Sequence, residues 1–282
     1  MRRIVAVIVA ALVGLGLAVT PAAAAPSMST RTVGHVHVHG YSVTLDCSGT
    51  GGPTVILFSG FGDKHTVWQD IQTHLAQHRR VCSYDRLGEG TSSKPRATQT
   101  LASNAHLLHA VLSKAHVRGR LVLVGHSIGG DIAAVYARTY PRASAGLVTL
   151  DATPPGYLNF VQKLIPAGAG GIDEALRQEA VTTLSGHNKE RLKLGRTTWA
   201  PLRSLRHTPL AVVEHGKDIF APAGKYAAPL QRHWARGQRR LAKLSWRSQL
   251  IIATRSGHYV FVDQPRLALD VINAVVAQSG RH

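Results

Sequence analysis

Residues 121–130 read Leu-Val-Leu-Val-Gly-His-Ser-Ile-Gly-Gly, and this segment is the strongest indication of the fold class. Its first four residues are apolar, which predicts a strand that is buried on both faces. The pattern G-x-S-x-G follows at once over 125–129, and apolar residues at helical spacing continue to Tyr140. A serine between such a strand and helix is held in a tight, exposed turn, where it can act as a nucleophile. Ser127 is therefore the candidate nucleophile, although a serine that only caps a helix would leave the same pentapeptide.

Outward from this stretch, short apolar runs alternate with segments of helical periodicity. An antiparallel hairpin is predicted over 33–46, and further strands over 54–58, 80–84, 147–150, 210–213 and 250–253. Helices are predicted over 68–78, 101–115, 128–140 and 265–277. Buried strands separated by helices imply an α/β fold, with a mostly parallel sheet that is covered on both faces. The interval 153–207 lacks a buried strand and is rich in Pro and Gly, so we expect an inserted lid of short helices there.

A serine hydroxyl needs a base, and the base needs a group that orients it. His258 lies on the loop after the last predicted strand, from which it can reach the carboxyl edge of the sheet. There it would take the serine proton and later return it to the leaving group. Asp218 is the expected orienting acid, because it follows the strand 210–213 and keeps the chain order Ser…Asp…His. Asp151, at the end of the strand 147–150, is the alternative acid.

Two backbone N–H groups are expected to stabilise the tetrahedral intermediate. Ser59-Gly60-Phe61-Gly62 follows the predicted strand 54–58. The N–H groups of Phe61 and Ile128 can therefore form an oxyanion hole. A plain glycine turn would have the same local sequence.

Taken in order, five segments resemble the α/β-hydrolase family. They are SGFGD at 59–63, YDRLGEGTSS at 84–93, GHSIGG at 125–130, HGKD at 215–218 and SGHYVFVDQP at 256–265. The resemblance covers 41–277 and implies an eight-stranded, mostly parallel sheet with a lid after the sixth strand. It also implies a serine hydrolase that acts on a small acyl substrate, most commonly an ester, without a cofactor. Segments such as DRLGEGTSS form a structural turn in the family, so Asp85, Arg86 and Ser92 are expected to be scaffold residues.

Two positions depart from the pattern of the family and leave the substrate class open. Ser59 stands where many members have histidine, and Glu89 stands where many have an apolar or aromatic residue. Both are expected to add polarity near the mouth of the pocket. A serine nucleophile argues against dehalogenase and epoxide hydrolase chemistry, which uses aspartate at this position in the family. Amide or peptide cleavage, and acyl transfer to an acceptor other than water, use the same triad and stay alternatives.

The first 24 residues are expected to be a secretory signal peptide. A pair of arginines precedes an uncharged apolar run over 4–19, which ends in small residues. Cleavage after Ala24 would leave one domain over 25–282, outside the cell and without a membrane span. An uncleaved membrane anchor is the rival interpretation, but the apolar run is short for a bilayer span.

Cys47 and Cys82 are the two cysteines of the chain. This number excludes a disulfide-rich scaffold and a four-cysteine zinc site. In an oxidising compartment an even pair can form a bridge. The family resemblance implies that the strands carrying the two residues are neighbours, so we expect a disulfide.

The chain is strongly basic, with 33 Lys and Arg against 15 Asp and Glu and a formal net charge of +18. Such a charge favours weak binding to anionic polymers or surfaces. A non-catalytic protein of this fold that binds such surfaces is therefore the alternative from another functional class. A basic stripe is formed by Arg232, Arg236, Arg239, Arg240, Lys243 and Arg247. A solvated helix face is its simpler interpretation, and sparse aromatic residues argue against specific nucleic-acid binding.

No cofactor and no metal are predicted. The sequence contains neither a phosphate loop nor a dinucleotide fingerprint. His35, His37 and His39 alternate on one predicted strand, but no carboxylate or further ligand is placed near them in the sequence.

Overall fold

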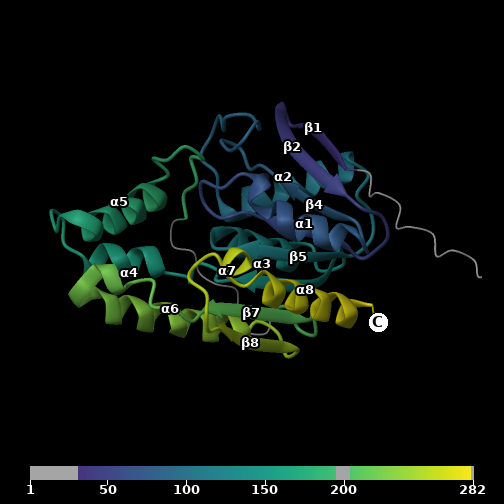
Figure 1. Cartoon of the computed structure of the whole chain (residues 1–282). Coiled ribbons are helices and arrows are strands. Elements are labelled where there is room, and N and C mark those ends of the chain that lie inside the picture. The colour runs from purple at the N-terminus through teal and green to yellow at the C-terminus, as the bar shows by residue number, and fades with distance from the viewer. Residues whose placement is uncertain (1–30, 195–203, 281–282) are drawn as a thin grey trace, which may run out of the picture.

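The structure is a computed structural model that describes residues 31–194 and 204–280. The expected signal peptide, 1–24, lies outside the described residues. Figure 1 shows a central sheet between two layers of helices, with a helical cap that projects at one end. Among the described residues, no helix combines the length and the apolar character needed to cross a bilayer.

Within the described residues, eight strands form one sheet in the order β1-β2-β4-β3-β5-β6-β7-β8. The pairs β1–β2 and β2–β4 are antiparallel, and every later pair is parallel. The strands are β1 (Thr32–Val38), β2 (Tyr41–Ser48), β3 (Thr54–Phe58), β4 (Val81–Tyr84), β5 (Leu121–His126), β6 (Ser144–Leu150), β7 (Leu210–His215) and β8 (Ser248–Ala253). This arrangement confirms the predicted α/β fold with a mostly parallel sheet. The parallel strands place their carboxyl ends on one edge of the sheet.

The side chains of the strands alternate between two apolar layers, as the period of two along a strand requires. Ile56 and Phe58 of β3 face the layer of α2 and α3, while Val55 and Leu57 face the layer of α1 and α8. The helices of the two layers are α1 (Gln69–Ala76), α2 (Leu101–Lys114), α3 (Ile128–Thr139) and α8 (Pro265–Ser279). Each layer shields one face of the sheet, which explains why the parallel strands are apolar along their whole length.

The cap comes from the chain between β6 and β7. The interval expected to hold a lid contains α4 (Tyr157–Leu164) and α5 (Gly171–Ser185), followed by a bridge between Leu192 and Gln99. Both helices share a small apolar core with α6 (Ala227–Ala242), to which α6 contributes Leu230 and Trp234. Two short 3-10 helices and a one-turn helix complete the order of elements: η1 (His65–Trp68), η2 (Ala221–Tyr226) and α7 (Val260–Asp263).

Cys47 and Cys82 form the expected disulfide. They lie directly opposite each other on β2 and β4, so the antiparallel register brings the two side chains together. The bridge closes a loop with a sequence separation of 35 residues. In the chain-entropy model, a loop of this length contributes about 3–4 kcal/mol to stability.

Candidate active site

Ser127 occupies a strained turn between β5 and α3. Its φ and ψ are 52° and −129°, a backbone conformation that residues other than glycine adopt only where the surroundings impose it. The turn requires the glycines that flank the serine, because a Cβ on Gly129 would overlap the carbonyl oxygens of Phe58 and Ser59. The sequence therefore specifies a partly exposed serine on a turn at the carboxyl edge of the sheet. Ser127 Oγ lies 3.3 Å from Thr153 Oγ1.

His258 pairs with Asp151. Its Nδ1–H donates to Asp151 Oδ2 over 2.7 Å. Asp151 follows β6 directly and is fully buried, whereas the His258 side chain keeps 28% of its surface exposed. The structure contradicts the expectation that Asp218 orients this histidine. Asp218 lies in the turn after β7, where its Oδ1 accepts a hydrogen bond from the backbone N–H of Phe220 over 3.0 Å.

Three further donors surround the Asp151 carboxylate. His215 Nδ1–H donates to Oδ2 over 2.8 Å, and the His215 backbone N–H donates to Oδ1 over 3.2 Å. Trp234 Nε1–H donates to Oδ1 over 2.8 Å. Burial by itself raises the pKa of Asp151, but the hydrogen bonds and charges of His215 and His258 outweigh it and hold this pKa at about 2. The carboxylate is therefore ionised throughout the neutral range.

His215 and Trp234 are site residues that the sequence did not reveal. His215 ends β7, the strand that pairs with β6, so its position beside Asp151 follows from the sheet order. Burial lowers the pKa of His215, but the Asp151 carboxylate raises it more, and the net shift is upward. The one sequence signal was the place of His215 at a carboxyl strand end. Trp234 lies 83 residues from Asp151 in the sequence, and no local pattern points to their contact.

His126 fixes the backbone of the base. Its Nε2–H donates to the carbonyl oxygen of His258 over 3.0 Å, and the centroids of the two rings lie 4.5 Å apart. Burial, reinforced by the charge of His258, lowers the pKa of His126 to about 3, so the ring is neutral at physiological pH. His126 therefore supports His258 without competing for its proton.

The loop that carries the expected oxyanion donor is held by a buried ion pair. Arg86 Nη1 and Nη2 donate to the carbonyl oxygens of Ser59 and Gly60 over 2.5 and 2.6 Å. The same guanidinium binds Glu190 at the end of the cap over 2.7 Å. Glu190 Oε1 also accepts from the backbone N–H of Gly62 over 3.0 Å. Arg86 and Glu190 thus fix the backbone on both sides of Phe61.

Phe61 and Ile128 line one cavity together with Ser127 and His258. Ile128 is the first residue of α3, where a backbone N–H has no partner within the helix. Both expected oxyanion residues therefore border the space in front of Ser127. Within the described ranges, Ser127 Oγ makes no hydrogen bond to His258, although both face this space.

The two residues that depart from the family pattern lie away from the cavity. Ser59 is buried, and its Oγ donates to the carbonyl oxygen of Lys64 over 3.3 Å. Glu89 is buried as well, and it binds Lys189 over 3.0 Å. The expectation that they add polarity at the pocket mouth is wrong, because neither side chain lines the cavity.

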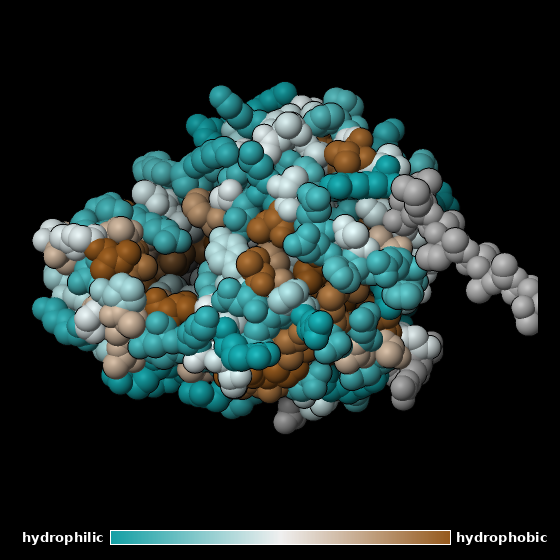
Figure 2. Space-filling model, viewed as in Figure 1, coloured by the Kyte–Doolittle hydropathy of each residue, from teal (hydrophilic) through white to brown (hydrophobic). Residues whose placement is uncertain are grey.

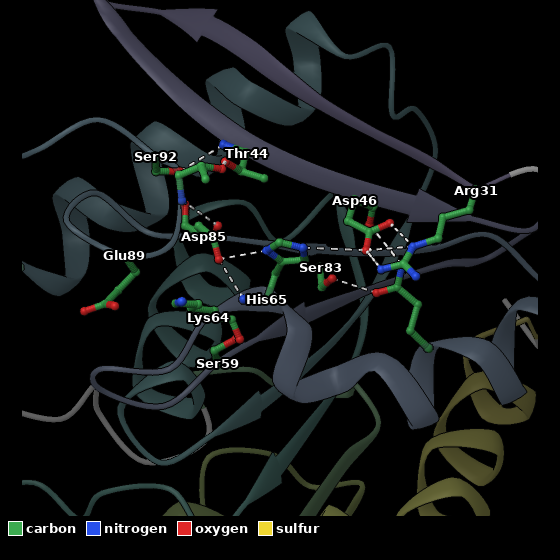
Figure 3. Close-up of polar contacts among 12 residues, drawn as sticks. Arg31, Thr44, Asp46, Ser59, Lys64, His65, Ser83, Asp85, Glu89 and Ser92 are labelled. Carbon is green, nitrogen blue, oxygen red and sulfur yellow. Dashed lines mark hydrogen bonds and ion pairs between the residues drawn. The ribbon is translucent and has the colours of Figure 1, made fainter.

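A polar cluster beside the site links the first strands to the turn after β4. His65 Nδ1 lies 2.9 Å from Asp85 Oδ1, and His65 Nε2 lies 3.8 Å from Asp46 Oδ2. Arg31 binds Asp46 from the other side over 2.6 Å (Figure 3). The hydrogen bond that His65 donates to Asp85 outweighs burial and raises the pKa of His65. Burial raises the pKa of Asp85, but its bonds to His65 and Thr91 outweigh this and lower it.

The cavity has a volume of about 300 Å³ and lies between the cap and the carboxyl edge of the sheet. Figure 2 shows a hollow with brown, apolar walls on the side of the molecule where the cap projects. Its apolar walls include Tyr157, Leu158, Val161, Leu176, Phe220 and Trp234. A cavity of this size fits a small or medium acyl group. Among the described residues, no group of three or more His, Cys, Asp or Glu is placed to hold a metal.

Comparisons with known proteins agree with this geometry. The family model of the α/β hydrolase fold matches residues 53–269 of the chain. An uncharacterised protein of Mycobacterium tuberculosis is 37% identical over 135 residues, which is 45% of this chain and 38% of that protein. The chain thus spans well under half the length of that curated relative.

Solved structures share the fold at low identity. A thermophilic esterase from Thermogutta terrifontis matches with a TM-score of 0.64 and 20% identity, over 89% of this chain and 99% of the esterase. A serine hydrolase involved in carbazole degradation matches with a TM-score of 0.64 and 19% identity, over 88% of this chain and 99% of that enzyme. At these identities the likeness extends to the fold alone.

Proposed function

The chain belongs to the α/β-hydrolase fold family, and from this premise we propose that it is a secreted serine hydrolase that cleaves a carboxylic ester. In this proposal Ser127 is the nucleophile, His258 the base and Asp151 the orienting acid. The observation that carries it is the 2.7 Å hydrogen bond from His258 to the buried Asp151 carboxylate, beside a serine on a strained turn. The disulfide supports an extracytoplasmic location.

The proposed reaction begins when Ser127 Oγ attacks the acyl carbon and passes its proton to His258 Nε2. Asp151 holds His258 Nδ1–H, which leaves Nε2 free to act as the base. The serine must turn from Thr153 toward His258, and we expect substrate binding to complete this hydrogen bond. The ionised Asp151 then stabilises the imidazolium that forms.

In this proposal, the N–H groups of Phe61 and Ile128 stabilise the negative charge that develops on the acyl oxygen. His258 returns the proton to the departing alcohol, and an acyl-enzyme remains on Ser127. Water then attacks the acyl carbon and gives a proton to His258. The bond between the acyl carbon and Ser127 Oγ breaks, His258 returns the proton to Oγ, and the carboxylic acid is released. Amide cleavage and acyl transfer would use the same steps with another leaving group or acceptor.

Labelling with a fluorophosphonate tests this proposal. We expect one phosphonate adduct on the wild-type protein, located on Ser127 by peptide mass spectrometry, and none on Ser127→Ala. Wild-type protein should also hydrolyse short p-nitrophenyl esters, and Ser127→Ala should not. A folded wild-type protein that neither takes the label nor hydrolyses esters would contradict the proposal. If such a protein bound anionic polymer as well as Ser127→Ala does, the non-catalytic alternative would be favoured.

A further inference from the structure

Glu179 is the one carboxylate among the described residues that line the cavity in front of Ser127. It lies on α5, on the same face as Leu176 and Thr183, which also line the cavity. Within the described ranges, no hydrogen bond or ion pair engages its carboxylate, although its backbone oxygen accepts from Thr182. The carboxylate is therefore available to a ligand.

Glu179 is a negatively charged group in a cavity that belongs to a strongly basic protein. The described lining contains no lysine or arginine, and His258 is its other ionisable group apart from the phenol of Tyr157. Glu179 is an exposed residue of the cap, but partial desolvation of its carboxyl group raises its pKa, while the charge of His258 opposes this shift. The whole chain carries a formal net charge of +18, which does not attract cations at long range. A cation would therefore be attracted to this cavity only by short-range contact with Glu179.

Aromatic rings provide the second half of a cation site. Tyr157, Phe220 and Trp234 line the same cavity, and the ring centroids of Tyr157 and Trp234 lie 4.8 Å apart in an edge arrangement. The faces of such rings attract ammonium groups, most strongly when water is excluded. A carboxylate near several aromatic rings is thus a suitable environment for an alkylated ammonium group.

We propose that Glu179, together with these rings, makes the cavity selective for acyl substrates that carry an ammonium or quaternary ammonium group. The proposal rests on the hydrolase function proposed above and names its substrate class. The acyl carbon would lie at Ser127, and the cationic end would lie between Glu179 on the cap and the aromatic wall. The cap helix α5 would then determine specificity, while the sheet edge carries the chemistry.

A pair of isosteric esters tests the proposal. One is the p-nitrophenyl ester of γ-trimethylammoniobutyrate, and the other replaces its nitrogen by carbon, so that a neutral tert-butyl group has the same shape. We expect the wild-type protein to prefer the cationic ester in kcat/KM, after correction for the uncatalysed rates. Glu179→Gln should lower this preference by about tenfold. Asp270→Asn, which removes an exposed carboxylate on α8, should leave it unchanged.

The outcomes separate the inference from the function on which it rests. Hydrolysis of the neutral ester without a preference for the cationic one would overturn the inference and leave the hydrolase function intact. Equal losses on both esters in Glu179→Gln would also overturn it, because Glu179 would then act on His258 rather than on the substrate. Hydrolysis of neither ester by the folded wild-type protein would contradict both. Competitive inhibition by butyltrimethylammonium, weakened in Glu179→Gln, would support the site independently of the acyl chain.

Discussion

Asp151 is the residue on which the proposed triad depends. Its carboxylate accepts more hydrogen bonds than the orientation of one histidine requires. Its carboxylate accepts hydrogen bonds from His258, from His215 and from Trp234 Nε1. An unpaired buried carboxylate is costly, so each donor offsets part of the cost of burial. The backbone of Asp151 has a φ of 49°, a left-handed conformation that a residue other than glycine adopts only where its surroundings impose it.

Replacement of Trp234 by phenylalanine removes one of these donors and keeps most of the ring. We expect Trp234→Phe to lower the free energy of unfolding by about 1–3 kcal/mol, because a charge-assisted hydrogen bond to a buried carboxylate is lost. Urea unfolding at neutral pH measures this change. Tyr157→Phe is the matched control, since Tyr157 packs against Trp234 without bonding to Asp151. An equal loss in both variants would show that packing, and not the bond to Asp151, dominates.

At the scale of elements, the ion pair of Arg86 and Glu190 joins the cap to the loop after β3. Both side chains are almost fully buried, with 1% and 2% of their surface exposed. Their bonds to Ser59, Gly60 and Gly62 restrain the loop that presents the Phe61 N–H. A loop restrained in this way keeps an oxyanion donor in place before substrate arrives, which is where such donors are most effective.

Glu190→Gln tests this restraint. We expect kcat to fall about tenfold or more while KM changes little, since the oxyanion hole acts mainly in the transition state. Glu89→Gln is the matched control, because Glu89 is also buried and bonds to Lys189, the residue before Glu190. The hydrogen bonds of the Glu89 side chain within the described residues do not include this loop. The restraint would be refuted if both variants kept the wild-type kcat, or if both lost it equally.

The contact between η1 and the turn after β4 gives stability a defined dependence on pH. The pKa of His65 is raised in the folded protein, so its contribution is complete below the unfolded value of about 6.5 and is lost as pH rises through the folded pKa. The pKa of Asp85 is lowered, so its contribution is present above an unfolded value of about 3.9 and is lost as pH falls through the folded pKa. The pair is therefore most stabilising in mildly acidic solution.

His65→Gln should remove the loss of stability that the wild-type protein shows as the pH rises through the pKa of His65. We expect the difference in unfolding free energy between wild type and His65→Gln to be larger at about pH 5.5 than at about pH 8.5. Urea titrations at both pH values measure it. A difference that is the same at both values, or that grows at alkaline pH, would show that His65 is not charged between Asp85 and Asp46.

For the whole molecule, the sequence was sufficient to predict features that depend only on residues close together in the chain. The strand predicted over 54–58 is β3 (Thr54–Phe58), because an apolar run of this length that follows Gly and Pro is typical of a buried strand. The turn that holds Ser127 was predicted correctly because it needs glycines that the sequence displays. The choice between Asp151 and Asp218 was not local. Both residues follow strands, and only the contacts of Trp234 and His258 with the Asp151 carboxylate show which of the two meets His258.

Contacts between distant segments explain the rest of what the sequence left open. Arg86 and Glu190 are 104 residues apart, and neither belongs to a pattern that names its partner. The position of Glu179 in the cavity depends on how α5 packs over the sheet edge. The helix α6 was visible in the sequence only as a basic stripe, although its opposite side carries Trp234 into the site.

The net charge is spread over the whole surface. We therefore expect binding to anionic polymers to depend on the number of basic residues and not on their position. Arg232, Arg236, Arg239, Arg240 and Lys243 are exposed on or next to α6. We expect Gln at these five positions to weaken binding to polyglutamate no more than Gln at five scattered, exposed basic positions, and both effects should vanish in high salt. The scattered set is Lys94, Lys114, Arg118, Arg142 and Lys163. Binding in low-salt buffer that only the first set abolishes would instead assign a docking surface to α6.

The most direct test of the triad compares Asp151→Asn with Asp218→Asn in the hydrolysis of one p-nitrophenyl ester. Asparagine at 218 can still accept the bond from Phe220 N–H, so we expect kcat/KM within about threefold of wild type. Asparagine at 151 loses the charge that orients and stabilises His258, and we expect kcat/KM to fall about a thousandfold or more. Near wild-type turnover by a folded Asp151→Asn, with loss in Asp218→Asn, would contradict the account.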